Sequence, residues 1–125
     1  MAEALIRGLL AARLAQPARL TVLGPAAPRC RHLQAEYSVH CARDAEELCR
    51  TSRVLVAAVK PQLADQALAA CNPFLTDDHL VISIMAGVSL ADLADIFTEP
   101  VRLIRAMPNN PALVLAGASA FIAND

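Results

Sequence analysis

Apolar residues in this chain follow two spacings, one typical of helices and one typical of strands. The helical spacing and its local breaks predict helices over residues 1–14, 29–36 and 62–71. Short apolar runs predict strands at Leu20–Leu23, Val39–Cys41, Val54–Val59, Leu80–Met85, Val101–Arg105 and Gly117–Ile122. Because the two kinds of segment alternate, the pattern predicts an α/β fold with right-handed crossovers and a mainly parallel sheet.

Capping signals predict two further, shorter helices. Asp44 is expected to cap a helix that ends at residue 49 or 50, since acidic residues would occupy the first turn of that helix. Ser89, with Asp92 three residues later, resembles a capping box that opens a helix ending near Phe97. Gly87 is expected to turn the chain just before that helix.

Two of the expected strands, Val54–Val59 and Leu80–Met85, are apolar throughout, so both faces of each strand are expected to be covered. This pattern is typical of a three-layer, Rossmann-like, doubly wound sheet. Such a unit opens with a strand, a glycine-rich turn and a helix. This sequence opens with a helix, and its four glycines form no GxGxxG motif. We therefore expect a doubly wound domain that lacks the first strand and the glycine-rich loop.

Composition narrows the possible classes of function. Apolar residues make up 56% of the chain and aromatic residues only 3%, so the core must be aliphatic. A net charge of −1, without a long basic block, argues against a nucleic-acid partner. No apolar run approaches the roughly 18–20 residues of a membrane span, so no membrane partner is expected. Charges at Glu3 and Arg7 interrupt any signal peptide, which favours a cytoplasmic protein.

Few side chains have the spacing of a metal or catalytic site. The four cysteines include no CxxC pair, so we expect reduced, mostly buried thiols and no metal site. His32, His40 and His79 are isolated in sequence and are expected at the surface or half-buried. Lys60 could donate a proton, but a solvated charge at a strand end is the more frequent role for such a residue.

Motifs in three parts of the chain carry a family resemblance. Residues 1–10 (MAEALIRGLL) are similar to the helix that follows the glycine loop of pyrroline-5-carboxylate reductases. Ala57–Gln62 (AAVKPQ) resembles the family's AVKP segment. Val81–Leu90 (VISIMAGVSL) resembles VSIAAGVSL, and Ile104–Ala112 (IRAMPNNPA) follows it at the family's spacing and resembles RAMPNTPA. Because the motifs occur together and in order, the chain is identified as a member of that family over nearly its whole length.

The resemblance implies an oxidoreductase of proline biosynthesis. The family reduces the cyclic imine 1-pyrroline-5-carboxylate to L-proline with NADPH or NADH. The residues it implies beside the cofactor follow two strands and are Ala58, Val59, Lys60, Pro61, Ile84, Met85 and Ala86. The residues it implies in a loop at the mouth of the substrate site are Met107, Pro108, Asn109 and Asn110. No catalytic side chain is implied, since the cofactor carries the hydride and the protein orients it. Met85 and Met107 could equally fill the core.

The resemblance also implies parts of the family's architecture that residues 1–125 do not include. These residues would be a partial NAD(P)-binding domain, without the helical C-terminal domain that forms the homo-oligomer and binds the imino acid. The first strand is central in the usual strand order, so two strands would lack a partner. Buried unpaired backbone groups each cost on the order of 1–3 kcal/mol. We therefore expect residues 1–125 alone to be unstable, aggregated or rearranged, for example with Leu20–Leu23 paired directly to Val54–Val59.

Arginines near the Leu20–Leu23 strand bear on cofactor choice. Arg29 and Arg31 could hold the 2′-phosphate of NADPH, although solvated charges on a helix surface are the more frequent role.

Two other functions remain open from the sequence. One is a non-catalytic, truncated remnant that persists as an interaction module. The other is a related NAD(P)-dependent reductase, such as a β-hydroxyacid dehydrogenase. The joint presence of the Lys60-Pro61 and Met107–Pro111 segments favours a pyrroline-5-carboxylate reductase over that second reductase.

Overall fold

The computed structural model describes residues 1–109 and 116–125, and along them helices alternate with strands. The first part contains α1 (Ala2–Ala11), β1 (Thr21–Val22), α2 (Ala27–Tyr37) and β2 (His40–Cys41). The second part contains α3 (Ala45–Thr51), β3 (Val54–Ala57), α4 (Ala64–Ala69), β4 (Leu80–Ser83), α5 (Leu90–Ile96), β5 (Arg102–Pro108) and β6 (Ser119–Ala123). Short 3-10 turns lie at Pro17–Arg19, Pro61–Leu63 and Asn72–Phe74.

The strands form two hydrogen-bonded sheets. In the first, β1 and β2 are parallel, with Thr21 opposite His40. The second has the order β3-β4-β5-β6, in which the first three strands are parallel and β6 is antiparallel to β5. The expectation of an α/β fold with mainly parallel strands is confirmed. The rearrangement given as an example, in which the Leu20–Leu23 strand pairs directly with the Val54–Val59 strand, does not occur in the structure, because β1 and β3 belong to different sheets.

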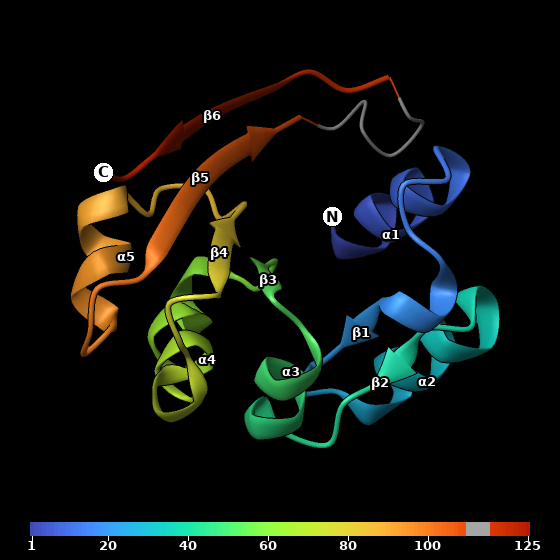
Figure 1. Ribbon diagram of the computed structural model, residues 1–125. Helices are drawn as coiled ribbons and strands as arrows, with labels where there is room; N and C mark the ends of the chain where they lie inside the picture. Colours follow the sequence, from blue (N-terminus) through green and yellow to red (C-terminus); the bar gives the residue numbers. More distant parts are fainter. Residues whose placement is uncertain (110–115) are drawn as a thin grey trace.

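Each sheet has a hydrophobic core of its own, which explains why β1 and β3 need not share an edge. The first core contains Ile6 from α1, Leu33 from α2 and Val39, the residue just before β2. The second core is larger and includes Val81 and Leu93 from β4 and α5. In Figure 1 the two groups are visible as α1 and α2 beside β1 and β2, and α4 and α5 beside the other sheet. Within the described residues, no helix has the length and apolar character needed to cross a membrane.

The capping signals of the sequence are confirmed by the ends of α3 and α5. The Asp44 carboxylate accepts a hydrogen bond from the Glu47 backbone N–H at 2.8 Å. Ser89 and Asp92 form a complete capping box, in which each side chain binds the other residue's backbone N–H. Gly87 has a φ of +74°, as a turn that favours glycine requires. These helices therefore begin where local hydrogen bonds satisfy their first N–H groups.

The expectation that both faces of the β3 strand are covered is wrong. Leu55 and Ala57 point into the second core, whereas Val54 and Val56 are 54% and 46% exposed. The second core, which includes residues of α3, α4 and α5, lies on the Leu55 and Ala57 side. Side chains alternate between the faces of a strand, so the two valines lie on the opposite side.

The end of β5 also differs from the sequence-based expectation of a loop over residues 107–111. Met107 and Pro108 are part of β5, because β6 pairs with them in an antiparallel hairpin, with Met107 opposite Ala120. Asn124 fastens the far end of β6, since its side chain accepts from the Leu103 N–H at 2.8 Å and donates to the Val101 carbonyl at 2.9 Å. Pairing with a distant strand, rather than local sequence, thus extends β5.

Candidate functional site

Three parallel strands, β3, β4 and β5, end at the same edge of the second sheet. The strand register places Ala57 opposite Ser83, and Ser83 opposite Arg105. The segments that follow β3 and β4 are linked directly, because the Ile84 N–H donates to the Ala57 carbonyl at 3.2 Å. The structure therefore places the starts of the segments 58–61 and 84–86 side by side, at the carboxyl ends of adjacent parallel strands.

The side chains in these two segments differ in exposure. Ala58, Val59 and Ile84 are half-buried, whereas Lys60, Pro61 and Ala86 are exposed. The Met85 side chain is only 2% exposed and belongs to the core, and its N–H donates to the Ser83 hydroxyl at 3.3 Å. The surface at this edge is thus formed by small or aliphatic side chains, and the Lys60 ammonium lies in solvent beside it.

The end of β5 contributes the third part of this edge. The Met107 side chain is 43% exposed, and Pro108 is half-buried at the last position of the strand. The Asn109 side chain accepts from the Ala118 N–H at 3.0 Å, which ties the start of the connection to the start of β6. Asn110, the remaining residue expected at the mouth of the site, lies outside the described residues.

Arg105 is a charged residue at this edge that the sequence reasoning did not single out. Among the described residues, its Nε is the buried side-chain nitrogen or oxygen atom that has no hydrogen-bond partner. A buried donor without a partner is costly and marks a place where a ligand or water can bind. The position of Arg105 opposite Ser83, inside the RAMP motif, is the signal that could have found it.

A second candidate region lies beyond the carboxyl ends of β1 and β2. It is a hollow of about 270 Å³, and its lining residues are Leu23, Gly24, Pro25, Ala27, Cys30, Arg31, Gln34, Cys41, Ala42 and Arg43. A side chain added at Gly24 would meet no heavy atom within 4 Å, so the loop after β1 leaves open space.

The two arginines considered in the sequence are separated by the structure. Arg29 pairs with the Glu3 carboxylate of α1, whereas Arg31 lines the hollow. Arg43, which the sequence reasoning missed, lines the hollow from the loop after β2. The spacing of Arg43 and Glu47, four residues apart, is the local signal that could have drawn attention to it.

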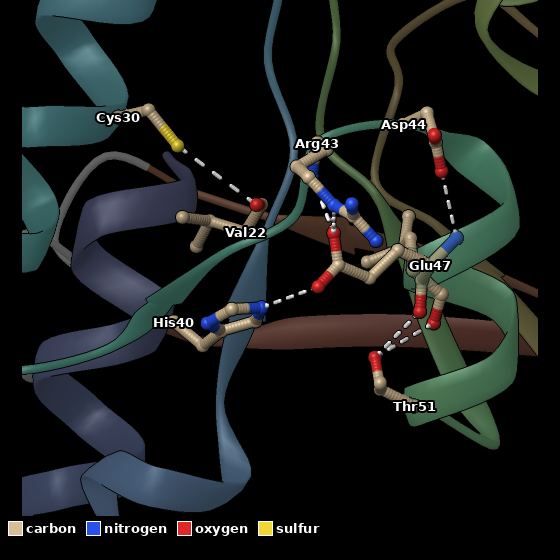
Figure 2. Close-up of polar contacts among 8 residues, drawn as sticks. Val22, Cys30, His40, Arg43, Asp44, Glu47 and Thr51 are labelled. Atoms are coloured by element: carbon tan, nitrogen blue, oxygen red, sulfur yellow. Dashed lines mark hydrogen bonds and ion pairs between the residues drawn. The ribbon is translucent and has the colours of Figure 1, made fainter.

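Glu47 organises the polar residues beside this hollow (Figure 2). One of its carboxylate oxygens accepts from both the backbone N–H and the Nε of Arg43, at 2.8 and 3.0 Å. Its other oxygen lies 3.0 Å from the His40 Nε2. The Arg43 hydrogen bonds, followed by that of His40, lower the pKa of Glu47 to about 2. Glu47 is therefore a carboxylate at neutral pH, and it also raises the pKa of Arg43.

Cys30, which lines the hollow, is a thiol and not an activated nucleophile. The Cys41 thiol donates to the Cys30 carbonyl at 3.1 Å. Burial, with a further contribution from Cys41, raises the pKa of Cys30 to about 11. Deeper in the second core, burial raises the pKa of Cys49 to about 12. All four cysteines are free, and Cys49 and Cys71 are buried, whereas Cys30 and Cys41 are only half-buried, so the expectation of mostly buried thiols holds for two of the four.

Comparison with known proteins places this arrangement among oxidoreductases. A family model described as NADP oxidoreductase, coenzyme F420-dependent, matches residues 1–87. The pyrroline-5-carboxylate reductase of Synechocystis sp. is 42% identical over 124 residues, which cover 99% of this chain and 46% of the relative. That of Escherichia coli (strain K12) is 35% identical over the same shares of the two chains. The chain thus spans about half the length of the curated relatives it matches.

Solved structures agree with these relatives. A pyrroline-5-carboxylate reductase from Coxiella burnetii superposes with a TM-score of 0.91 at 29% identity, and the match covers 99% of this chain and 46% of that one. The Plasmodium falciparum pyrroline carboxylate reductase, solved with NADP bound, gives a TM-score of 0.84 at 28% identity over 98% of this chain and 44% of that one. The resemblance and the Rossmann-like fold class expected from the sequence are confirmed.

Proposed function

We propose a function for this chain, which belongs to the family described as NADP oxidoreductase, coenzyme F420-dependent. In this proposal the chain is the dinucleotide-binding part of a pyrroline-5-carboxylate reductase, which reduces 1-pyrroline-5-carboxylate to L-proline with NADPH or NADH. Relatives of that name and the NADP-bound structure support it. The observation that carries it is the common edge at which β3, β4 and β5 end.

The residues at that edge fit a dinucleotide. Ala58 and Ala86 are small enough to let a flat ring approach the strand ends, and Ile84 offers an aliphatic surface. The reduced nicotinamide, when bound, supplies the hydride, and the chain's own task is to orient it. The hydrogen bond from the Ile84 N–H to the Ala57 carbonyl fixes the two segments relative to each other. In the hollow beyond β1 and β2, Arg31 and Arg43 offer the cationic hydrogen-bond donors that phosphate groups require.

The proposal also assigns separate roles to different parts of the protein. Residues 1–125 form part of the NAD(P)-binding domain. Binding of the cyclic imino acid and assembly of a homo-oligomer fall to a helical domain elsewhere in the protein. Residues Met107–Asn110 form the side of the substrate site that this chain contributes. We place the protein in the cytoplasm, which the free cysteines support.

A coupled assay tests this function in the protein that carries these residues. We expect NADPH oxidation, followed by its fluorescence, to depend on added 1-pyrroline-5-carboxylate, with L-proline detected by mass spectrometry. Parallel reactions contain a β-keto acid or an oxidised deazaflavin in place of the imine. NADPH oxidation that depends on one of these acceptors, and not on the imine, contradicts the proposal.

A pair of variants connects the assay to the strand-end edge. Ala58→Leu adds bulk where the ring approaches, and overpacking of about 1–3 kcal/mol is expected to lower NADPH affinity by roughly tenfold. Ala69→Leu makes the same change at an exposed position on α4 and serves as the matched control. Equal effects of the two variants would show that the edge does not contact the cofactor.

A further inference from the structure

Two half-buried thiols, those of Cys30 and Cys41, meet in the wall of the hollow beyond β1 and β2. Cys30 lies in the first turn of α2, and Cys41 is the last residue of β2. Both residues line the hollow. Because α2 is the crossover between β1 and β2, the fold brings together two cysteines that are 11 residues apart in sequence.

The contacts of the two thiols place them close enough to react with each other. The Cys41 thiol donates to the Cys30 carbonyl at 3.1 Å. The Cys30 thiol donates to the carbonyl of Val22, the residue opposite Cys41 in the strand register, at 3.8 Å (Figure 2). The two cysteine side chains also hydrogen-bond to each other, and this contact adds to the raised pKa of Cys30. A disulfide between neighbouring thiols of this kind requires side-chain rotation and little backbone movement.

A second pair of neighbouring thiols in the same chain provides an internal comparison. Cys49 and Cys71 also contact each other, and after burial this contact is a cause of the pKa of Cys49 being raised to about 12. The two residues are only 3% and 6% exposed and belong to the second core. A dissolved oxidant reaches thiols in an open hollow more readily than thiols inside a core. The two pairs therefore have the same chemistry and differ in access.

We propose that Cys30 and Cys41 form a redox-sensitive pair, which a small disulfide such as oxidised glutathione converts into a reversible disulfide that joins α2 to β2. The Cys41 thiolate attacks one sulfur of the oxidised glutathione, and one glutathione thiolate leaves. The Cys30 thiolate then attacks the Cys41 sulfur, and the second glutathione thiolate leaves. The two protons lost by the cysteines pass through solvent to the two glutathiones, so two cysteines are oxidised as one glutathione disulfide is reduced.

The order of the two attacks follows from burial. Burial raises the pKa of Cys30 to about 11, so this thiol is the poorer first nucleophile. Cys41 therefore reacts first, and Cys30 attacks only after a mixed disulfide lies beside it. The four free cysteines of the structure correspond to the reduced state.

The cross-link would strengthen the part of the fold that has the smaller core. The buried residues of that core are Ile6, Leu33 and Val39. A disulfide restricts the unfolded chain, and here it also ties the covering helix to the strand pair. Oxidation therefore stabilises the β1–β2 unit. The inference goes beyond the proposed function, because it requires no nucleotide and no turnover.

Peptide mapping by mass spectrometry tests the pair in the folded protein that carries these residues. The protein is equilibrated in glutathione buffers that range from reducing to oxidising, quenched with acid, unfolded and alkylated. We expect peptides joined through Cys30 and Cys41, lighter by two hydrogen atoms than their reduced forms, and we expect dithiothreitol to separate them. Cys49 and Cys71 are expected to be recovered as alkylated thiols.

Hydrogen exchange on the same samples measures the effect on the fold. We expect the amides of His40 and Ala42 to exchange at least about tenfold more slowly after oxidation, because the cross-link opposes local opening of the β1–β2 unit. The amide of Val81, in the other sheet, is expected to exchange at the same rate before and after oxidation.

Cysteine variants identify the thiols that are responsible. Cys30→Ser and Cys41→Ser are each expected to abolish both the cross-link and the slower exchange. Cys71→Ala removes a thiol of the buried pair and is the matched control, which is expected to retain both effects.

The outcomes are distinct from those of the catalytic assay. Recovery of Cys30 and Cys41 as free thiols, or as a mixed disulfide that does not resolve, in the most oxidising buffer overturns the proposal. Equal cross-linking of Cys49 and Cys71 also overturns it, since general unfolding would then expose both pairs. A Cys30–Cys41 cross-link that leaves exchange unchanged overturns the stabilising role. A cross-link confined to this pair that slows exchange at His40 and Ala42 supports the proposal, whichever substrate the protein reduces.

Discussion

At the scale of single residues, Glu3 joins α1 to α2. Its carboxylate accepts a hydrogen bond from the Tyr37 hydroxyl at 2.7 Å, pairs with Arg29 and lies 3.6 Å from the His32 Nε2. The Tyr37 hydrogen bond, followed by that of Arg29, lowers the pKa of Glu3 to about 2. The sequence offered no sign of this contact, because Glu3 and Tyr37 lie far apart along the chain.

Because the folded pKa of Glu3 lies below its usual value of 4.5, the charged carboxylate stabilises the fold. That contribution is present above about pH 4.5 and is lost as the pH falls through about 2. We expect Glu3→Gln to lower the melting temperature by a few degrees at neutral pH. The difference from the wild type should shrink between these two pH values, as followed by circular dichroism.

Glu36→Gln is the control for this change, since it removes the same charge from the exposed surface of α2. It is expected to leave the melting temperature unchanged. A Glu3→Gln variant whose destabilisation is as large at pH 2 as at pH 7 would show that packing, and not charge, explains the effect.

His79 has a buried position that the sequence alone did not indicate. It was expected at the surface or half-buried, but only 7% of it is exposed. Its Nδ1 accepts from the Thr76 N–H at 2.9 Å, which leaves its Nε2 to donate to the Cys49 carbonyl at 2.9 Å. Both ring nitrogens therefore have a hydrogen-bond partner. This role depends on α3 lying beside the residue that precedes β4, and no local sequence pattern indicates that proximity.

At the scale of elements, helices with local start signals were predictable and strand boundaries were less so. The caps at Asp44 and Ser89 use hydrogen bonds within three residues, so sequence spacing alone identifies them. The exposed face of β3 and the hairpin that lengthens β5 depend on partners far along the chain. The strand ends of the candidate site were predictable because their motifs are contiguous. Arg43 was missed because its neighbours in the hollow come from other segments.

The α5 capping box gives a direct test of an element's stability. Ser89→Ala removes the side chain that binds the Asp92 N–H at 3.1 Å, so one of the first N–H groups of the helix loses its partner. We expect the free energy of unfolding to fall by about 1 kcal/mol in urea denaturation. Asp95→Ala, at an exposed position nearer the end of the same helix, should cost nothing. Equal losses in the two variants would contradict the capping role.

At the scale of the whole molecule, the two sheets differ in the size of their cores. Among residues 1–109 and 116–125, the first core has three buried residues and the second has eleven, so far more apolar surface holds the second sheet together. The β1–β2 unit is also linked to the rest through polar contacts, such as that of His40 with Glu47. Unequal cores imply that the two parts of the fold have unequal stability.

Native-state hydrogen exchange measures this difference residue by residue. We expect the amides of His40 and Ala42, which donate to the Leu20 and Val22 carbonyls, to open with a lower free energy than those of Val81 and Ile82 in β4. A nucleotide that binds beyond β1 and β2 should raise protection at the first two amides most strongly. A single opening free energy shared by all four amides would indicate one cooperative unit.

The attachment of β6 depends in part on the side-chain amide of Asn124, a group that can deamidate with time. The strand carries the exposed side chains of Phe121 and Ile122, and its far end is fixed by the one amide side chain of Asn124. Spontaneous deamidation would replace that amide with a carboxylate, which cannot donate to the Val101 carbonyl and would repel its partially negative oxygen. Ageing at alkaline pH would therefore remove one attachment of the outer strand, and its exposed apolar side chains would become more available for edge-to-edge aggregation.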